Sequence, residues 1–244
     1  MTSPVDPAGR FGGVTFAFDL DGTLVDTAPD LIGTLNVMLV AEGLRPAPVE
    51  AARHLVGSGV RAMLEHGFRE AGADLDEARL PGLTDRFIDL YRPRIARDSR
   101  PFDGVPEVLD RLAAEGAVLC VCTNKQTDLS TALLDQLGLL HRFAAVVGPD
   151  LVSARKPSGA HLREAVLLAG GDPARCLMIG DSGADVGAAR ELGAPVVLVS
   201  FGYTPIPAAE LGADAVIDRF ADLEAVAATF FDAPRQSHRK APLR

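Results

Sequence analysis

Two aspartates, Asp19 and Asp21, stand two residues apart directly after the short apolar run 14–18. Gly22, a turn-forming residue, and Thr23 follow the second aspartate. A carboxylate at the end of a strand can act as a nucleophile without a helper base, because it is already ionised at neutral pH. A second carboxyl group nearby can serve as general acid and base. A simple Asx-turn needs one Asp and one Gly, so the pair predicts nucleophilic catalysis at this position.

Polar and charged residues in two later segments could bind a phosphoryl group. Thr123, Asn124 and Lys125 come directly after the apolar run 117–122, where a hydroxyl and backbone N–H groups can hold phosphate oxygens. A helix cap formed by Thr or Asn accounts for the same turn. Lys156, just before a helical pattern, could neutralise a nucleophile and a phosphoryl group, although most lysines at such places are simply solvated. Each motif taken alone therefore leaves a structural explanation open.

An acidic pair, Asp181 and Asp185, follows the apolar run 176–179 and Gly180. The spacing lets Asp181 extend from the end of a strand while Asp185 lies in the first turn of the next helix. Carboxylate oxygens suit Mg²⁺, which keeps several of its water ligands. Acidic residues in a first turn also complement the helix dipole. The pair thus predicts a magnesium site, with helix stabilisation as the alternative.

These residues need a scaffold that brings strand ends together, and the apolar pattern predicts one. Short runs rich in Val, Ile and Leu recur, as expected of strands buried on both faces, at 14–18, 117–122, 144–147, 176–179, 195–199 and 215–217. Helical patterns lie between the later runs, near 105–115, 128–138, 158–169 and 183–193. This alternation predicts an α/β fold, a Rossmann-like, doubly wound parallel sheet with helices on both faces.

The segment 27–99 behaves differently, because it has helical periodicity and no convincing strand. The helical patterns cover 30–41, 60–71 and 76–95. We therefore expect an all-helical domain over 27–99, inserted into an α/β core formed by 13–26 and 100–232. The edges 28–29 and 98–104 are plausible hinges. Residues 1–12 and 233–244 are polar and lack a periodic apolar pattern, which predicts flexible tails.

The composition of the chain excludes several classes of protein. Its 244 residues are 48% hydrophobic, enough for a sizeable core, and carry a net charge of -9. That charge argues against binding to nucleic acid or to a membrane surface, and it predicts a metal ion in any site that handles phosphate. The three cysteines lie in apolar runs, which predicts reduced thiols in a cytoplasmic protein. We find neither a secretion signal nor an apolar run near the ~20 residues of a membrane span.

In their order along the chain, the motifs resemble those of the haloacid dehalogenase superfamily of aspartate-nucleophile phosphotransferases. The resemblance covers 14–230 and rests on the segments 19–23, 123–124, 156–157 and 180–185. Within that superfamily, other segments look like those of phosphoglycolate phosphatases, namely 25–31, 56–59, 104–105 and 123–125. One departure is Gly159, where relatives often carry a proline, and it leaves Lys156 in place.

The resemblance implies a role for each core motif. Asp19 would attack phosphorus and Asp21, oriented by Thr23, would be the general acid and base. Mg²⁺ would bind the Asp19 side chain, the carbonyl oxygen of Asp21 and the Asp181 side chain. Asp185 would hold metal-bound waters or the phosphate-binding lysine. The phosphoryl oxygens would be bound by Thr123, Asn124 and Lys156.

The resemblance also makes the helical insertion a mobile cap that selects the substrate. Glycines bring backbone close to a small ligand, and the cap carries such a loop at Gly57, Ser58 and Gly59. Either Arg61 or Lys125 would pair with a substrate carboxylate. A plain loop between two helices and a solvated arginine are the alternatives.

The sequence therefore predicts a Mg²⁺-dependent phosphomonoester hydrolase that forms an aspartyl-phosphate and acts on a small phosphorylated metabolite. The first candidate for this substrate is 2-phosphoglycolate. The alternatives are a sugar-phosphate phosphatase, a β-phosphoglucomutase-like enzyme or a pyrophosphatase of the same superfamily. A catalytically silent protein that binds a phosphometabolite is also possible, but a pure binder does not need a carboxyl group such as that of Asp21 for proton transfer. The sequence leaves open whether the protein is a monomer or a homodimer.

Overall fold

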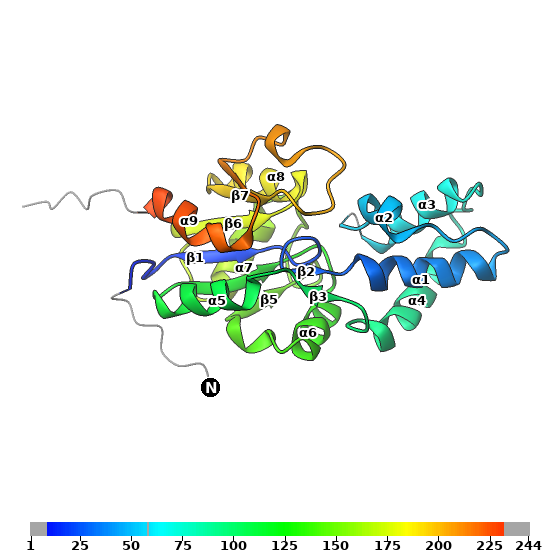
Figure 1. The fold of residues 1–244 in the computed structure, drawn as a ribbon, viewed down its shortest axis with the longest axis horizontal. Helices are drawn as coiled ribbons and strands as arrows, with labels where there is room; N and C mark the ends of the chain where they lie inside the picture. Colours follow the sequence, from blue (N-terminus) through cyan, green and yellow to red (C-terminus); the bar gives the residue numbers. More distant parts are fainter. Residues whose placement is uncertain (1–8, 58, 232–244) are drawn as a thin grey trace, which may run out of the picture.

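A parallel sheet forms the centre of the computed structural model, which describes residues 9–57 and 59–231. The terminal residues 1–8 and 232–244, which include most of the expected tails 1–12 and 233–244, lie outside the described residues. In the part of the chain that the structure describes, the strands of this sheet lie side by side in the order β5-β4-β1-β6-β7-β8 (Figure 1). Their bounds are Thr15–Phe18 for β1, Val118–Cys122 for β4, Ala145–Val147 for β5, Cys176–Gly180 for β6, Val196–Val199 for β7 and Ala215–Ile217 for β8. Each strand falls on one of the predicted apolar runs, and each neighbouring pair is parallel.

Helices cover both faces of the sheet, which confirms the doubly wound α/β prediction. In β1 the side chains alternate, with Phe16 and Phe18 on one face and Ala17 on the other. The phenylalanine face packs against α5 (Val105–Ala114), α6 (Thr127–Gln136) and α9 (Leu223–Phe231). The alanine face packs against α7 (Gly159–Leu168) and α8 (Gly183–Leu192). The short helix α9 was not predicted, because its residues are apolar nearly all round and show no helical stripe.

The segment between the first strand and the rest of the sheet is helical. It contains α1 (Ala28–Ala41), α2 (Val49–Ala52), α3 (Val60–Glu70) and α4 (Leu80–Tyr91), which lie together to one side of the sheet (Figure 1). Pro29 stands in the first turn of α1, where its missing N–H group costs nothing. With four residues, α2 is too short to show a period in the sequence.

The chain leaves and re-enters the α/β part of the molecule through two segments that lie side by side. They form a short antiparallel pair, β2 (Val25–Asp26) and β3 (Arg100–Pro101), in which Asp26 lies opposite Arg100. Both crossings between the helical insertion and the sheet are therefore held in one place.

Residues 9–12 differ from the expected tail, because they form a turn that packs on the core. Phe11 is fully buried and its ring centroid lies 5.1 Å from that of Phe16, edge to face. Its N–H group donates a hydrogen bond to the carbonyl oxygen of Glu115. A single aromatic residue carries no periodicity, so the sequence pattern did not indicate this contact.

Among the helices of the described chain, none combines the length and the apolar character needed to cross a bilayer.

Candidate active site

The predicted polar motifs meet at the carboxyl ends of β1, β4 and β6, three neighbouring strands at the centre of the sheet. The order of the strands reverses at this point, which is where open α/β sheets bind ligands. The N–H group of Asp19 continues the ladder by donating to the carbonyl oxygen of Ile179, over 2.8 Å. Asp19 therefore has its backbone fixed by the sheet while its side chain is free to face the site.

Lys156 bridges two of the predicted carboxylates. Its Nζ atom lies 2.8 Å from Oδ1 of Asp19 and 2.7 Å from Oδ1 of Asp185. Burial alone would lower the pKa of Lys156, but the charges of Asp185 and Asp19 outweigh burial and raise that pKa above its ordinary value. The ammonium group thus remains charged throughout the physiological pH range.

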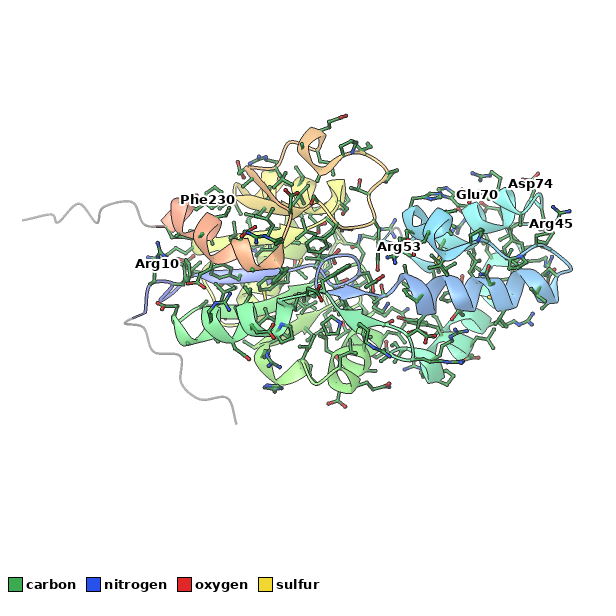
Figure 2. All side chains as sticks on the ribbon, in the orientation of Figure 1. Arg10, Arg45, Arg53, Glu70, Asp74 and Phe230 are labelled. Atoms are coloured by element: carbon green, nitrogen blue, oxygen red, sulfur yellow. The ribbon has the colours of Figure 1, made fainter. Side chains whose placement is uncertain are left out.

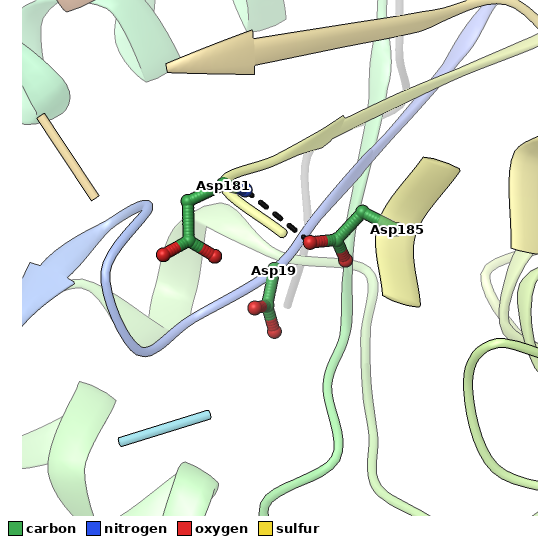
Figure 3. A group of neighbouring side chains, drawn as sticks. All are labelled: Asp19, Asp181 and Asp185. Atoms are coloured by element: carbon green, nitrogen blue, oxygen red, sulfur yellow. Dashed lines mark hydrogen bonds between the residues drawn. The ribbon is translucent and has the colours of Figure 1, made fainter. Parts of the chain in front are cut away.

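Asp19, Asp181 and Asp185 form a buried acidic cluster (Figure 3). Each offers an oxygen atom, and these atoms all lie within 4.8 Å of one another. Burial raises the pKa of Asp19 to about 6, against the opposing charge of Lys156, and burial with the neighbouring carboxylates raises the pKa of Asp181 well above its ordinary value. A hard divalent cation would relieve this excess of buried negative charge, so the donor set fits Mg²⁺.

Asp185 is held by its own helix rather than pointing freely into the cluster. It stands at the third position of α8 and forms a capping box with Ser182. Its Oδ2 atom accepts hydrogen bonds from the backbone N–H of Asp181 over 3.2 Å and from the Ser182 hydroxyl over 2.7 Å. Lys156 occupies its Oδ1 atom. With both oxygens engaged, Asp185 is suited to orient its neighbours and water more than to bind a metal directly.

Asp21, the second aspartate of the first motif, has a cation of its own. The Nζ atom of Lys125 lies 3.2 Å from its Oδ1 atom, and also 4.7 Å from the ring centroid of Tyr91. The hydroxyl of Thr23, which was expected to orient Asp21, is buried and has no hydrogen-bond partner among the described residues. Within that part of the chain, Lys125 orients Asp21 instead.

The backbone conformation and the close packing at Gly22 require a glycine between the two aspartates and the following strand. Its φ angle is 86°, in the left-handed region that favours glycine. A Cβ atom there would also collide with Oδ2 of Asp181. Gly22 thus lets the loop after β1 pass against the acidic cluster.

The residues after β4 lie beside Lys156. Thr123 is buried, and its hydroxyl accepts a hydrogen bond from the N–H group of Lys125 over 3.2 Å. The side-chain amide of Asn124 donates to the carbonyl oxygen of Lys156 over 3.1 Å. The structure therefore brings the two predicted phosphate-binding motifs together, although they are 32 residues apart in sequence.

A cavity of about 240 Å³ opens over these residues and is lined by both the sheet and the helical insertion. The insertion contributes Gly57 and Gly59, both in the left-handed region, whereas Ser58 lies outside the described residues. Arg61 also lines the cavity, but its side chain is 60% exposed and pairs with Glu65 and Glu77. Four of the predicted specificity residues, Gly57, Gly59, Arg61 and Lys125, thus line one cavity, and Arg61 is already paired with acidic neighbours.

Sequence reasoning missed three residues of the site. Tyr91 lies under the Lys125 ammonium group, and the N–H group of Tyr203 donates to Oδ2 of Asp181 over 2.7 Å. Long-range packing brings both tyrosines to the site, and no local pattern marks them. Arg155 lines the cavity and forms no ion pair within the described residues. Its position next to Lys156 was the one signal available in the sequence.

Comparisons with known proteins agree with this geometry. The family described as haloacid dehalogenase-like hydrolase matches residues 14–193. A phosphoglycolate phosphatase of Caulobacter vibrioides is 57% identical, over 86% of this chain and 89% of the relative. An N-acetylmuramic acid 6-phosphate phosphatase of Pseudomonas aeruginosa is 37% identical, over 82% and 88%.

The fold is also similar to solved structures. A crystal structure from Haemophilus somnus, titled as a predicted phosphoglycolate phosphatase, superposes with a TM-score of 0.80 at 30% identity, covering 87% of this chain and 97% of that one. The family match spans well over half of the sequence and includes the acidic cluster and Lys156. This chain therefore belongs to the haloacid dehalogenase-like hydrolase family.

Proposed function

We propose that the chain is a Mg²⁺-dependent phosphatase that hydrolyses 2-phosphoglycolate to glycolate and phosphate through an aspartyl-phosphate. The observation that carries this proposal is that two carboxylates with different cationic partners open into one cavity. Asp19 is held by Lys156, whereas Asp21 is held by Lys125. Such an arrangement supplies a nucleophile and a separate proton donor to the same substrate.

In the first step, an oxygen of Asp19 attacks phosphorus in line, and the bond between phosphorus and the ester oxygen breaks. Asp21 gives its proton to the departing alkoxide, which leaves as glycolate. In the second step Asp21 takes a proton from water, which attacks the acyl phosphate and releases phosphate from Asp19. Splitting the reaction lets water attack an acyl phosphate, from which the Asp19 carboxylate leaves more readily than an alkoxide leaves from the ester.

The other site residues hold the phosphoryl group and the metal. Lys156 keeps its positive charge and would bind phosphoryl oxygens together with the Thr123 hydroxyl and the Asn124 N–H group. The side chains of Asp19 and Asp181 and the carbonyl oxygen of Asp21 would hold Mg²⁺, with Asp185 acting through water. The ion would supply electrostatic stabilisation of the charge that develops on the phosphoryl oxygens.

For the substrate carboxylate, we propose Lys125 rather than Arg61 as the partner. Lys125 is buried, lines the cavity and stands beside Asp21, where the leaving group must depart. Arg61 is already paired with Glu65 and Glu77 at an exposed site.

Residues 27–99 would form the substrate-selecting cap, and residues 13–26 with 100–232 the catalytic core. The three free, buried cysteines support a cytoplasmic location.

A sugar-phosphate phosphatase is the second candidate. The wall of the cavity that the insertion provides is apolar at Leu55, Val56 and Met63, and this surface could cover a substrate larger than phosphoglycolate. The similarity to the phosphatase that acts on N-acetylmuramic acid 6-phosphate points the same way.

Phosphate release from a panel of esters with Mg²⁺ tests both candidates. The panel contains phosphoglycolate, N-acetylmuramic acid 6-phosphate, glucose 1-phosphate and pyrophosphate, with Asp19→Asn as the control. A kcat/KM for phosphoglycolate well above the others, lost in the variant, is the expected result. Higher kcat/KM for a sugar phosphate would reject phosphoglycolate but keep the chemistry. Binding of the esters without any release would mean a silent binding protein.

A further inference from the structure

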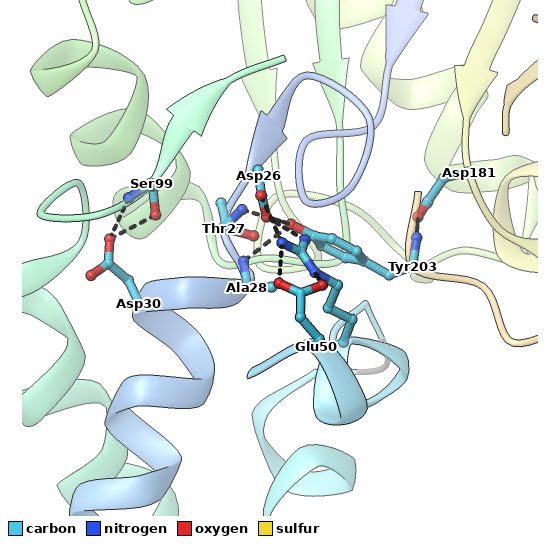
Figure 4. Close-up of polar contacts among 9 residues, drawn as sticks. Asp26, Thr27, Ala28, Asp30, Glu50, Ser99, Asp181 and Tyr203 are labelled. Atoms are coloured by element: carbon cyan, nitrogen blue, oxygen red, sulfur yellow. Dashed lines mark hydrogen bonds and ion pairs between the residues drawn. The ribbon is translucent and has the colours of Figure 1, made fainter. Parts of the chain in front are cut away.

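Tyr203 connects the acidic cluster to the first crossing into the helical insertion (Figure 4). Its backbone N–H donates to Oδ2 of Asp181 over 2.7 Å. Its hydroxyl donates to Oδ1 of Asp26 over 2.6 Å and accepts from the N–H groups of Thr27 and Ala28, over 2.7 and 3.0 Å. One residue thus contacts a candidate metal ligand with its backbone and the start of α1 with its side chain.

Arg53 extends this connection into the insertion. It lies in the 3₁₀ turn η1 (Arg53–Leu55), where the insertion meets the sheet (Figure 2). Its guanidinium binds both carboxylate oxygens of Asp26, over 2.7 and 3.0 Å, and also pairs with Glu50. The same guanidinium lies 5.6 Å from the ring centroid of Tyr203. Leu55, at the end of η1, lines the cavity, so the connection runs from the cavity wall to Asp181.

The charges along this path are well defined. Burial would raise the pKa of Asp26, but hydrogen bonds from Arg53 and Tyr203 lower it below its ordinary value. Burial and the neighbouring Asp26 raise the pKa of Tyr203. At neutral pH the tyrosine is therefore a neutral donor and the aspartate an ionised acceptor. Charge-assisted hydrogen bonds of this kind are short and strong.

A second tether shows what is particular about Tyr203. Oδ2 of the fully buried Asp30 accepts hydrogen bonds from the N–H and the hydroxyl of Ser99, over 2.8 and 2.7 Å (Figure 4). This contact joins the two crossings to each other. Tyr203 instead joins the first crossing to the acidic cluster, so a movement of the insertion would change the position of Asp181.

We propose that Tyr203 is a positioning residue that couples the placement of the helical insertion to the placement of Asp181. The inference rests on the proposed function in one respect, namely that Asp181 holds Mg²⁺. Because coupling between two sites is reciprocal, contacts made by Arg53 should strengthen Mg²⁺ binding, and Mg²⁺ should in turn steady the segment around Arg53. Closure over a substrate and binding of the metal would then favour each other.

Isothermal titration of the full chain with Mg²⁺ alone tests the coupling. Tyr203→Phe keeps the ring and the backbone N–H group but removes the hydroxyl. Arg53→Gln removes the ion pair with Asp26, and Arg53 itself does not contact Asp181. We expect each variant to bind Mg²⁺ about fivefold more weakly than the wild type. Arg142→Gln is the matched control, since Arg142 also binds both oxygens of an aspartate, Asp110, but far from the site.

Hydrogen exchange supplies the reciprocal measurement. Mg²⁺ should slow exchange at residues 49–57 in the wild type, and this protection should be lost in Tyr203→Phe. Protection there that survives in Tyr203→Phe, Mg²⁺ affinities equal to that of the wild type in both variants, or a wild type that binds no Mg²⁺ would each overturn the inference. If Tyr203→Phe does not fold, Arg53→Gln decides. A wild type that shows the coupling but does not hydrolyse phosphoglycolate would reject the proposed substrate alone.

Discussion

The ammonium group of Lys125 lies 3.2 Å from Oδ1 of Asp21 and 4.7 Å from the ring centroid of Tyr91. A single buried cation therefore connects the proposed proton donor with the wall that the helical insertion contributes. Burial would lower the pKa of Lys125, but the charge of Asp21 and the contact with Tyr91 together outweigh burial and raise that pKa. A carboxylate on the leaving group would meet a permanent positive charge at this place.

Lys125→Met should discriminate between substrates that carry a carboxylate and those that do not. Loss of a charged hydrogen-bonding partner should lower kcat/KM for phosphoglycolate by about 10- to 100-fold. Ethyl phosphate, which lacks the carboxylate, should lose less, because only the contact with Asp21 is removed. Steady-state kinetics on the two esters measure the difference. Equal losses on both would show that Lys125 serves Asp21 and not the substrate.

Arg61→Ala should leave KM for phosphoglycolate within about twofold of the wild-type value, since exposed ion pairs contribute little. The guanidinium already pairs with Glu65 and Glu77, and the side chain is 60% exposed. Arg155→Ala is the informative companion, because Arg155 lines the same cavity and has no ion pair within the described residues. A large rise in KM for Arg61→Ala would show that Arg61 binds the substrate carboxylate.

The sequence predicted the sheet because strands buried on both faces are continuous apolar runs, and each run became a strand. It predicted which polar motifs lie together, because the carboxyl ends of neighbouring parallel strands share one edge. It could not predict Tyr203, which reaches Asp26 across 177 residues of sequence through the packing of a loop. Nor could it show that Glu77 pairs with Arg61, since the position of the turn before α4 against α3 depends on the tertiary fold.

Asp19→Asn should stabilise the metal-free protein while abolishing turnover. Burial raises the pKa of Asp19 from 3.8 to about 6 in the folded state, so ionisation of this group lowers stability as the pH rises between these two values, and the loss is complete above about pH 6. With a chelator at pH 7.5, we expect urea unfolding to show a gain of about 2 kcal/mol, and at pH 4, where the wild-type carboxyl is protonated, the gain should vanish. Saturating Mg²⁺ should stabilise the wild type and reverse the order. A less stable variant at pH 7.5 would mean that the contact between Asp19 and Lys156 outweighs burial.

His161 should make the stability of the fold depend on pH below neutrality. The residue is fully buried, its Nδ1 atom accepts a hydrogen bond from the N–H group of Lys156, and its Nε2 atom lies 3.2 Å from the carbonyl oxygen of Val147. This pattern requires the neutral ring with its proton on Nε2, because a proton on Nδ1 would face the Lys156 N–H group. Burial, together with the charge of Lys156, lowers the pKa of His161 to about 4.

Between pH 6.5 and pH 4 the unfolded chain binds a proton at His161 that the folded chain does not. The stability that depends on the neutral ring is thus complete above about pH 6.5 and is lost as the pH falls toward 4, by roughly 2 kcal/mol. His161→Gln keeps an acceptor and a donor in similar places but does not titrate, so its unfolding free energy should fall less over the same range. Urea unfolding of both proteins at pH 7 and pH 4.5 measures the difference. Parallel losses in the two proteins would assign the acid sensitivity to other groups and would mean that protonation of His161 is tolerated in the folded state.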